Sequence, residues 1–351
     1  MSRRSVSSIL VFGLLLVLFV VAIFVPVPYV TMSPGPTVNV LGETGGKSIV
    51  AVQGHKTYPT KGQLRLTTVS VTSPGRSINL LEAMRAWFDR TRAVYPRDVI
   101  YPPQQTAQDA EQQSSVEMVS SQDTAVAAAL TELGYKLPLH VEVLGVTKDG
   151  PADGRLKVRD QIVSVNGTKV TDVAQVTALV QKVGVGHVAR FDVRRDGRTR
   201  TVAVTPHAST QGPKRALVGI TIGTGYDFPF DVSVRLSEQI GGPSAGLVFS
   251  LAVYDALTPG ALTGGAEIAG TGTISRRGLV GPIGGIQQKI VAAAEAGAKV
   301  FFVPPGNCGS ALHSGVKEGE IRLVKAPTLH SAIGSLQKYD QNPSAALPSC
   351  R

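Results

Sequence analysis

The sequence predicts an α+β protein of several folded units that begins with a membrane-spanning helix. Three observations support this prediction. The chain of 351 residues is longer than one ordinary domain. An uninterrupted apolar run lies close to its N-terminus, and short strand-like stretches alternate with helical ones over the rest. Apolar residues make up 43% of the chain and charged residues only 17%, which excludes a largely disordered protein.

The apolar run covers residues 9–25 and, with its flanking residues, reaches the roughly 20 positions that a spanning helix needs. No pair of small residues suited to signal-peptidase cleavage follows it, which favours an uncleaved anchor at 9–29. Arg3 and Arg4 precede the run, so the positive-inside tendency places residues 1–8 in the cytoplasm. We therefore expect a single-pass protein of the cell membrane whose bulk lies outside the cytoplasm.

Residues 30–119 are expected to form a separate β-rich region that contains one helix. Apolar residues recur at helical spacing over 77–92, and this pattern predicts that Trp87 packs in a core. The stretch 95–114 is rich in Pro, Gln and Asp without periodicity, which indicates a long surface connection. A second helix is expected over 115–133, with a domain boundary near its start.

The segment 120–210 has the strand, turn and helix pattern of a compact module. Turn dipeptides such as Asn166-Gly167 are typical of hairpins. The order of its small and apolar residues resembles that of bacterial PDZ domains; the resemblance is carried by Gly150, Ala152, Asp153, Gly154, Leu156, Asp160, Ile162, Val165, Asn166 and Gly167. It implies that an extended peptide binds by adding a strand at a sheet edge. Leu133-Gly134-Tyr135 is the candidate for the loop that holds the peptide terminus.

A glycine-rich turn, Gly241-Gly242-Pro243-Ser244-Ala245-Gly246, leads into an apolar helical stretch. Glycine permits strained backbone geometry and proline starts helices well, so Ser244 is expected beside exposed backbone N–H groups at a positive helix end. A nucleophile there would have an oxyanion site next to it. The same motif is also compatible with a simple helix cap.

Lys289 lies early in a second helical stretch that follows another glycine-rich turn, at 278–285. A lysine with its ordinary pKa of about 10.4 is protonated near neutral pH and cannot take a proton from serine. Apolar surroundings and the positive helix end would both lower this pKa. The alternative is an ordinary lysine whose amine extends to water.

The two turns, their order and the strand 268–274 between them resemble the proteolytic domain of Lon proteases. The resemblance implies a peptidase domain at 211–340 in which Ser244 is the nucleophile, Lys289 is the general base and Thr271 supports the lysine. Gly242, Pro243 and Ala245 form the turn that carries the oxyanion site. Two departures from the family pattern, Ile240-Gly241 before the turn and Thr273 after Thr-Gly, leave this dyad in place.

The predicted function is therefore an ATP-independent, membrane-anchored serine endopeptidase that cleaves peptides or proteins outside the cytoplasm after capture by the PDZ-like domain. The alternative is a PDZ scaffold whose peptidase-like domain binds without cleaving. Gly42 to Ser48 is one residue short of a phosphate-loop spacing and is interpreted as a turn. No cofactor or metal is implied. Homo-oligomers are compatible with the family resemblance.

Charge and cysteine content complete the expectations. The net charge of +10 is dispersed and aromatic residues make up 5%, a combination that argues against nucleic-acid binding. Cys308 and Cys350 are the two cysteines; outside the cytoplasm they could form a disulfide that pins the tail at 341–351, or remain free thiols.

Overall fold

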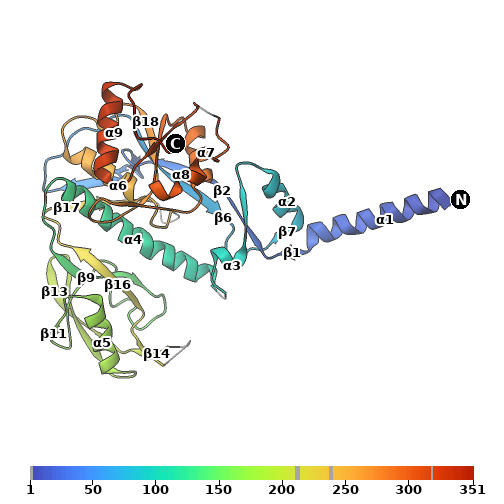
Figure 1. The fold of residues 1–351 in the computed structure, drawn as a ribbon. Coiled ribbons are helices and arrows are strands. Elements are labelled where there is room, and N and C mark those ends of the chain that lie inside the picture. The colour runs from blue at the N-terminus through green and yellow to red at the C-terminus, as the bar shows by residue number, and fades with distance from the viewer. Residues whose placement is uncertain (1–2, 104, 210–213, 237–239, 318) are drawn as a thin grey trace.

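The computed structural model describes residues 3–103, 105–209, 214–236, 240–317 and 319–351 (Figure 1). Helices and strands alternate throughout this part of the chain, which confirms the α+β prediction. The expected boundary at 210 and 211 lies outside the described residues.

The N-terminal helix α1 spans Arg3–Phe24 and projects away from the rest of the molecule (Figure 1). Its stretch Ser7–Phe24 is long and apolar enough to cross a membrane, and none of it is buried by other residues. The short strand β1 (Pro26–Val27) follows and pairs with β7 (Ile78–Asn79), which leads directly into α2 (Leu80–Phe88). Trp87 of α2 is 74% exposed, so its predicted place in a core is wrong.

The larger unit is built on one six-stranded sheet. Its strands, in spatial order, are β22 (Arg322–Lys325), β21 (Val300–Val303), β18 (Glu267–Gly270), β6 (Gln63–Val71), β2 (Tyr29–Asn39) and β8 (Ala93–Pro96). β18 is parallel to both β6 and β21, whereas β2 is antiparallel to β6 and β8. The segment expected as a separate β-rich region therefore supplies strands to the centre of the same sheet as the C-terminal segment.

The helices α6 (Gly246–Leu257) and α7 (Ile286–Glu295) pack against this sheet, and α4 (Ala107–Glu132) and α9 (Leu329–Gln341) pack against α6. One hydrophobic core joins residues of β6, α4, α6 and α9, so remote parts of the chain fold as one unit. The expected surface connection at 95–114 is wrong over its second half, because α4 begins at residue 107. Thr106 and Asp109 form a capping box there. The short helix α3 (Arg97–Ile100) lies just before.

The PDZ-like unit is inserted between α4 and the strand β17 (Asp231–Val234), which pairs with β5 (Val50–Gln53) of the larger unit. It has its own core. Its sheet runs β13 (Arg198–Val204), β12 (Ala189–Arg195), β10 (Gln161–Val165), β9 (Leu139–Val146) and β16 (Ile220–Tyr226), with β11 (Thr168–Lys169) beside β10. The helix α5 (Val173–Val183) and the pair β14 (His207–Ala208) and β15 (Ala216–Leu217) complete it. Since β16 belongs to this sheet, the unit extends beyond the predicted limit of residue 210.

The C-terminal tail is fixed to the catalytic unit. A disulfide joins Cys308, at the start of α8 (Cys308–Ala311), to Cys350. Next to it, Ser349 forms an isolated antiparallel β-bridge with Val324 of β22. Shorter elements complete the fold: the hairpins β3 (Glu43–Thr44) with β4 (Lys47–Ser48) and β19 (Thr273–Ile274) with β20 (Val280–Gly281), and the 3-10 turn η1 (Pro305–Asn307).

Candidate active site

Ser244 lies in a tight turn immediately before α6. Gly242 has a φ of +87°, a conformation that favours glycine, and α6 begins at Gly246 with Ala245 as its N-cap. The helix is buried along nearly its whole length. Behind the turn, the N–H of Gly272 donates to the Ser244 carbonyl oxygen at 2.9 Å. The serine hydroxyl is thus attached to a rigid part of the core.

Helix α4 holds the other side of this turn. The Ser114 carbonyl accepts a hydrogen bond from the Gly242 N–H at 3.1 Å, and the Ser121 hydroxyl donates to the Pro243 carbonyl at 3.1 Å. A Cβ atom on Gly241 would clash with the Ser114 side chain. The sequence contains no motif that links α4 to the turn, so this support was not predicted. The one sequence feature that could have indicated it is the spacing of Ser114 and Ser121, two small polar residues seven positions apart.

Lys289 reaches Ser244 from the second turn of α7. Its Nζ lies 2.6 Å from the Ser244 Oγ and 3.2 Å from the Thr271 Oγ1. The side chain is only 2% exposed, so the alternative of a lysine that extends to water is wrong. Burial lowers the pKa of Lys289 to about 8. A large fraction of the amine is therefore neutral at mildly alkaline pH, as a proton acceptor must be.

The N-terminal end of α7 is fixed against the sheet. Gly285, its N-cap, has a φ of +68°, and a Cβ atom there would meet Val69 of β6 and Met32 of β2. A larger residue would have to displace these two side chains. The close packing of helix and sheet sets the position from which Lys289 approaches the serine.

Thr271 follows β18 and is fully enclosed, with 1% exposure. Its hydroxyl donates to the Ser244 carbonyl at 3.0 Å and lies within hydrogen-bond distance of the Lys289 amine. One side chain thus contacts both the backbone of the serine and the nitrogen of the lysine.

The three predicted oxyanion-turn residues differ in what they can donate. The Gly242 N–H is already bonded to Ser114, and Pro243 has no N–H. Within the described residues, the N–H groups of Ser244 and Ala245 donate no hydrogen bond. The N–H groups still available to donate are therefore those of Ser244 and Ala245.

A cavity of about 520 Å³ opens beside the dyad. It is lined by Ser244 and Lys289, by residues 67–71 of β6, and by Met118 of α4. β18 pairs with β6 only as far as Leu66, so β6 continues past the end of its neighbour on that side. The open edge of a strand therefore borders the cavity.

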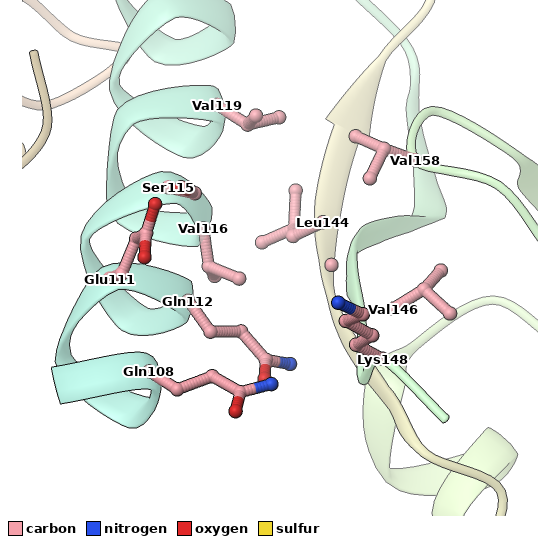
Figure 2. A pocket seen from close by; sticks show the side chains of 11 residues that line it. Gln108, Glu111, Gln112, Ser115, Val116, Val119, Leu144, Val146, Lys148 and Val158 are labelled. Atoms are coloured by element: carbon pink, nitrogen blue, oxygen red, sulfur yellow. The ribbon is translucent and has the colours of Figure 1, made fainter. Parts of the chain in front are cut away.

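A second cavity, of about 630 Å³, lies between α4 and the PDZ-like unit (Figure 2). Gln112, Val116 and Val119 of α4 face Leu144 and Val146 of β9 across it. The Gln112 side chain donates to the Thr147 hydroxyl at 3.2 Å. The cavity is lined by α4 and the PDZ-like unit and contains no member of the dyad.

Two other sequence predictions have clear outcomes. Tyr135 of the candidate peptide-binding loop packs against the ring of Phe230, with 5.7 Å between centroids, and against the catalytic core. The loop therefore does not lie at an edge of the PDZ-like sheet, and that prediction is wrong. The stretch from Gly42 to Ser48 forms the β3–β4 hairpin around Gly45 and Gly46, in agreement with its interpretation as a turn.

Comparison with known proteins identifies both units. The PDZ domain family matches residues 114–205, and the Lon protease (S16) C-terminal proteolytic domain matches residues 238–315. A solved PDZ domain of the SdrC-like protein of Listeria innocua is 19% identical and covers 24% of this chain and 92% of its own, with a TM-score of 0.22.

Curated Lon proteases are similar to the catalytic part. The archaeal Lon protease of Methanothermobacter thermautotrophicus is 32% identical over 139 residues, 36% of this chain and 21% of the relative. The Lon protease of Metamycoplasma arthritidis is 40% identical over 87 residues, 23% of this chain and 10% of the relative. The chain thus spans only 10% to 21% of the length of these relatives. It carries a PDZ domain and a Lon-type proteolytic domain.

Proposed function

We propose that this chain, with its PDZ domain and Lon-type proteolytic domain, is a serine endopeptidase in which Ser244 is the nucleophile and Lys289 the general base. The observation that carries the proposal is the 2.6 Å contact between the Ser244 Oγ and a buried amine of lowered pKa, at the wall of an open cavity. A lysine with a purely structural role does not require a contact with a serine hydroxyl. A non-reactive serine does not require an open cavity beside it.

In the proposed reaction, the neutral Lys289 amine takes the Ser244 proton as the Oγ attacks the substrate carbonyl carbon. The N–H groups of Ser244 and Ala245 donate to the oxyanion of the tetrahedral intermediate. When the peptide C–N bond breaks, the Lys289 ammonium gives its proton to the leaving nitrogen. Water, deprotonated by Lys289, then attacks the acyl ester. As the ester C–O bond breaks, the Lys289 ammonium returns this proton to the Ser244 Oγ and the second product leaves. Thr271 holds the serine backbone and the lysine amine in register.

The substrate is proposed to bind as an extended peptide along residues 67–71 of β6. This edge borders the cavity and has no strand partner on the β18 side in the described chain. Its free backbone groups suit an added strand. The dyad would then face one carbonyl of the bound peptide.

The proposal includes single-pass membrane anchoring by α1, with both domains outside the cytoplasm. The apolar, unburied helix supports the anchor, and the Cys308–Cys350 disulfide is of a kind that persists in oxidising compartments. Peptide capture by the PDZ domain and independence from ATP are parts of the same proposal.

A fluorophosphonate probe tests the dyad on the full chain in detergent. We expect labelling of the wild type, none of Ser244→Ala, and a loss of at least about a hundredfold in labelling rate for Lys289→Gln. Lys299→Gln, an exposed lysine of the same domain, is the matched control. Equal labelling of wild type and Lys289→Gln would contradict a lysine base. Absence of labelling and of peptide cleavage in the wild type would favour the inactive PDZ scaffold.

A further inference from the structure

The surface of α2 carries an apolar stripe that no other part of the described chain covers. Leu80, Met84, Trp87 and Phe88 recur at helical spacing and are 42%, 47%, 74% and 78% exposed. Ala83 and Ala86 of the same helix are buried. We call these four residues, with the exposed Tyr29 beside them, the α2 patch. An amphipathic helix that turns its large apolar side chains outward indicates a partner.

The backbone places the α2 patch next to the end of the spanning helix. Pro26 of β1, two residues after the last residue of α1, pairs with Asn79, the N-cap of α2. Two extended residues cover about 7 Å and paired strands lie about 5 Å apart, so α2 starts at the depth of the lipid head groups if α1 spans the bilayer. In Figure 1, α2 and β7 lie between α1 and the main body.

The composition of α2 and its flanks matches a membrane interface. Trp and Tyr are enriched at head-group level, where an amphipathic ring contacts both apolar chains and water. Arg85 and Arg90 near the patch are exposed and, within the described residues, form no ion pair. Free arginines beside an apolar stripe favour anionic lipid, because each adds attraction to a negative surface.

We propose that the α2 patch inserts into the outer leaflet of an anionic membrane and forms a second contact beside α1. The inference rests on the proposed anchoring by α1 and adds an interfacial helix to it. Two attachment points would restrict rotation of the catalytic unit about the single helix. They would hold the dyad at one orientation relative to the membrane surface.

Trp87 is the single tryptophan of the chain, so its fluorescence reports on the α2 patch alone. We would reconstitute the full chain into vesicles of phosphatidylcholine and phosphatidylglycerol that carry bromine either near the head-group end or near the methyl end of the acyl chains. Head-group-end bromine should quench Trp87 emission by about half or more, and methyl-end bromine should quench it less. Flotation of the same vesicles measures anchoring by α1 independently.

These outcomes distinguish anchoring by α1 from insertion of the α2 patch. Failure to float contradicts the anchor, whereas flotation with unquenched Trp87 overturns the α2 patch proposal alone. Phe88→Asp should reduce quenching, and Leu217→Asp, at a similarly apolar but distant exposed position in β15, should leave it unchanged. Trp87 emission that is shielded from bromine and shifts with protein density would assign the patch to contacts between copies, and would also overturn the proposal.

Discussion

Lys289 can act as a base because the fold withholds water from its amine. The side chain is enclosed by apolar neighbours of α7 and the sheet, and its polar contacts are two neutral hydroxyls. Within the described chain, no carboxylate forms an ion pair with it. A nearby negative charge would stabilise the ammonium and raise the pKa, so its absence is as important as the burial.

The rate of cleavage should follow the neutral fraction of Lys289. Since burial lowers its pKa to about 8, kcat/KM should rise about tenfold per pH unit well below pH 8 and level off above it. A fluorogenic peptide assayed across this range with the full chain measures the profile. A flat profile through pH 8 would mean that another group accepts the proton.

Replacing Lys289 with methionine should stabilise the protein while it abolishes activity. The unfolded lysine has a pKa near 10.5 and the folded one about 8, so the unfolded state binds more protons between these values. The destabilisation is therefore complete below pH 8 and disappears as pH rises toward 10.5. At neutral pH, Lys289→Met should gain on the order of 3 kcal/mol in unfolding free energy from the removed desolvation, and the lost hydrogen bonds reduce this gain.

Denaturant unfolding of the catalytic unit at neutral and at alkaline pH tests this expectation. The exposed Lys299→Met serves as control, because it should show no gain that depends on pH. A Lys289→Met protein that is less stable than wild type at neutral pH would show that the contacts to Ser244 and Thr271 outweigh desolvation.

At the scale of elements, α4 joins the two domains to the nucleophile. On one face, Ser114 and Ser121 of α4 form hydrogen bonds with the turn that contains Ser244. On another face, Val116 meets Gly145 of the PDZ strand β9 so closely that a Cβ atom on the glycine would clash. Asp123 forms a 2.5 Å ion pair with Arg159 of the PDZ domain. A shift of the PDZ domain against α4 would therefore reach the turn through a single rigid helix.

Sequence periodicity located only part of α4. The second half of the helix is rich in alanine and buried, and the prediction found it. The first half lies between two units, so polar residues such as Gln112 and Ser115 face a neighbour and the usual apolar spacing is missing. The same reasoning failed for Trp87, because an amphipathic pattern does not reveal whether the apolar face meets protein or another medium.

The contact between α4 and the turn can be tested with a paired substitution. Gly241→Ala places a methyl group against the Ser114 side chain and should displace the turn, with a loss of about tenfold or more in kcat/KM. Ser114→Gly removes the obstructing atoms, although glycine inside a helix costs about 1 kcal/mol of stability.

The double variant should recover most of the activity of Gly241→Ala while remaining less stable than wild type. Peptide cleavage and thermal unfolding, measured for the wild type, both single variants and the double variant, complete a double-mutant cycle. Additive losses in activity would mean that the turn does not depend on this contact.

At the scale of the whole molecule, the PDZ domain and the Lon-type domain do not follow one another along the chain, because the PDZ domain is inserted into the Lon-type unit. The Ser-Lys turns and the PDZ motif were predicted from local patterns, and the comparisons confirm both domains. Local patterns do not reveal that β6 pairs with β18 across some two hundred intervening residues, because parallel pairing leaves no turn signal. The N-terminal strands were therefore assigned to a separate region, although they complete the catalytic sheet.

The PDZ domain should be removable without loss of the catalytic fold. Leu139 and Tyr226 are paired at its two ends, and the Asp227 N–H donates to the Pro138 carbonyl at 3.0 Å. Residues 139–226 can therefore be replaced by a short glycine linker that spans one strand spacing. Since the dyad and β6 lie outside the insertion, we expect fluorophosphonate labelling and short-peptide cleavage within about threefold of wild type.

Cleavage of protein substrates should fall much further if the PDZ domain captures them. The same excision in Ser244→Ala controls for contaminating activity, and loss of peptide cleavage in a folded excised protein would mean that the PDZ domain holds α4, and through it the Ser244 turn, in the active arrangement.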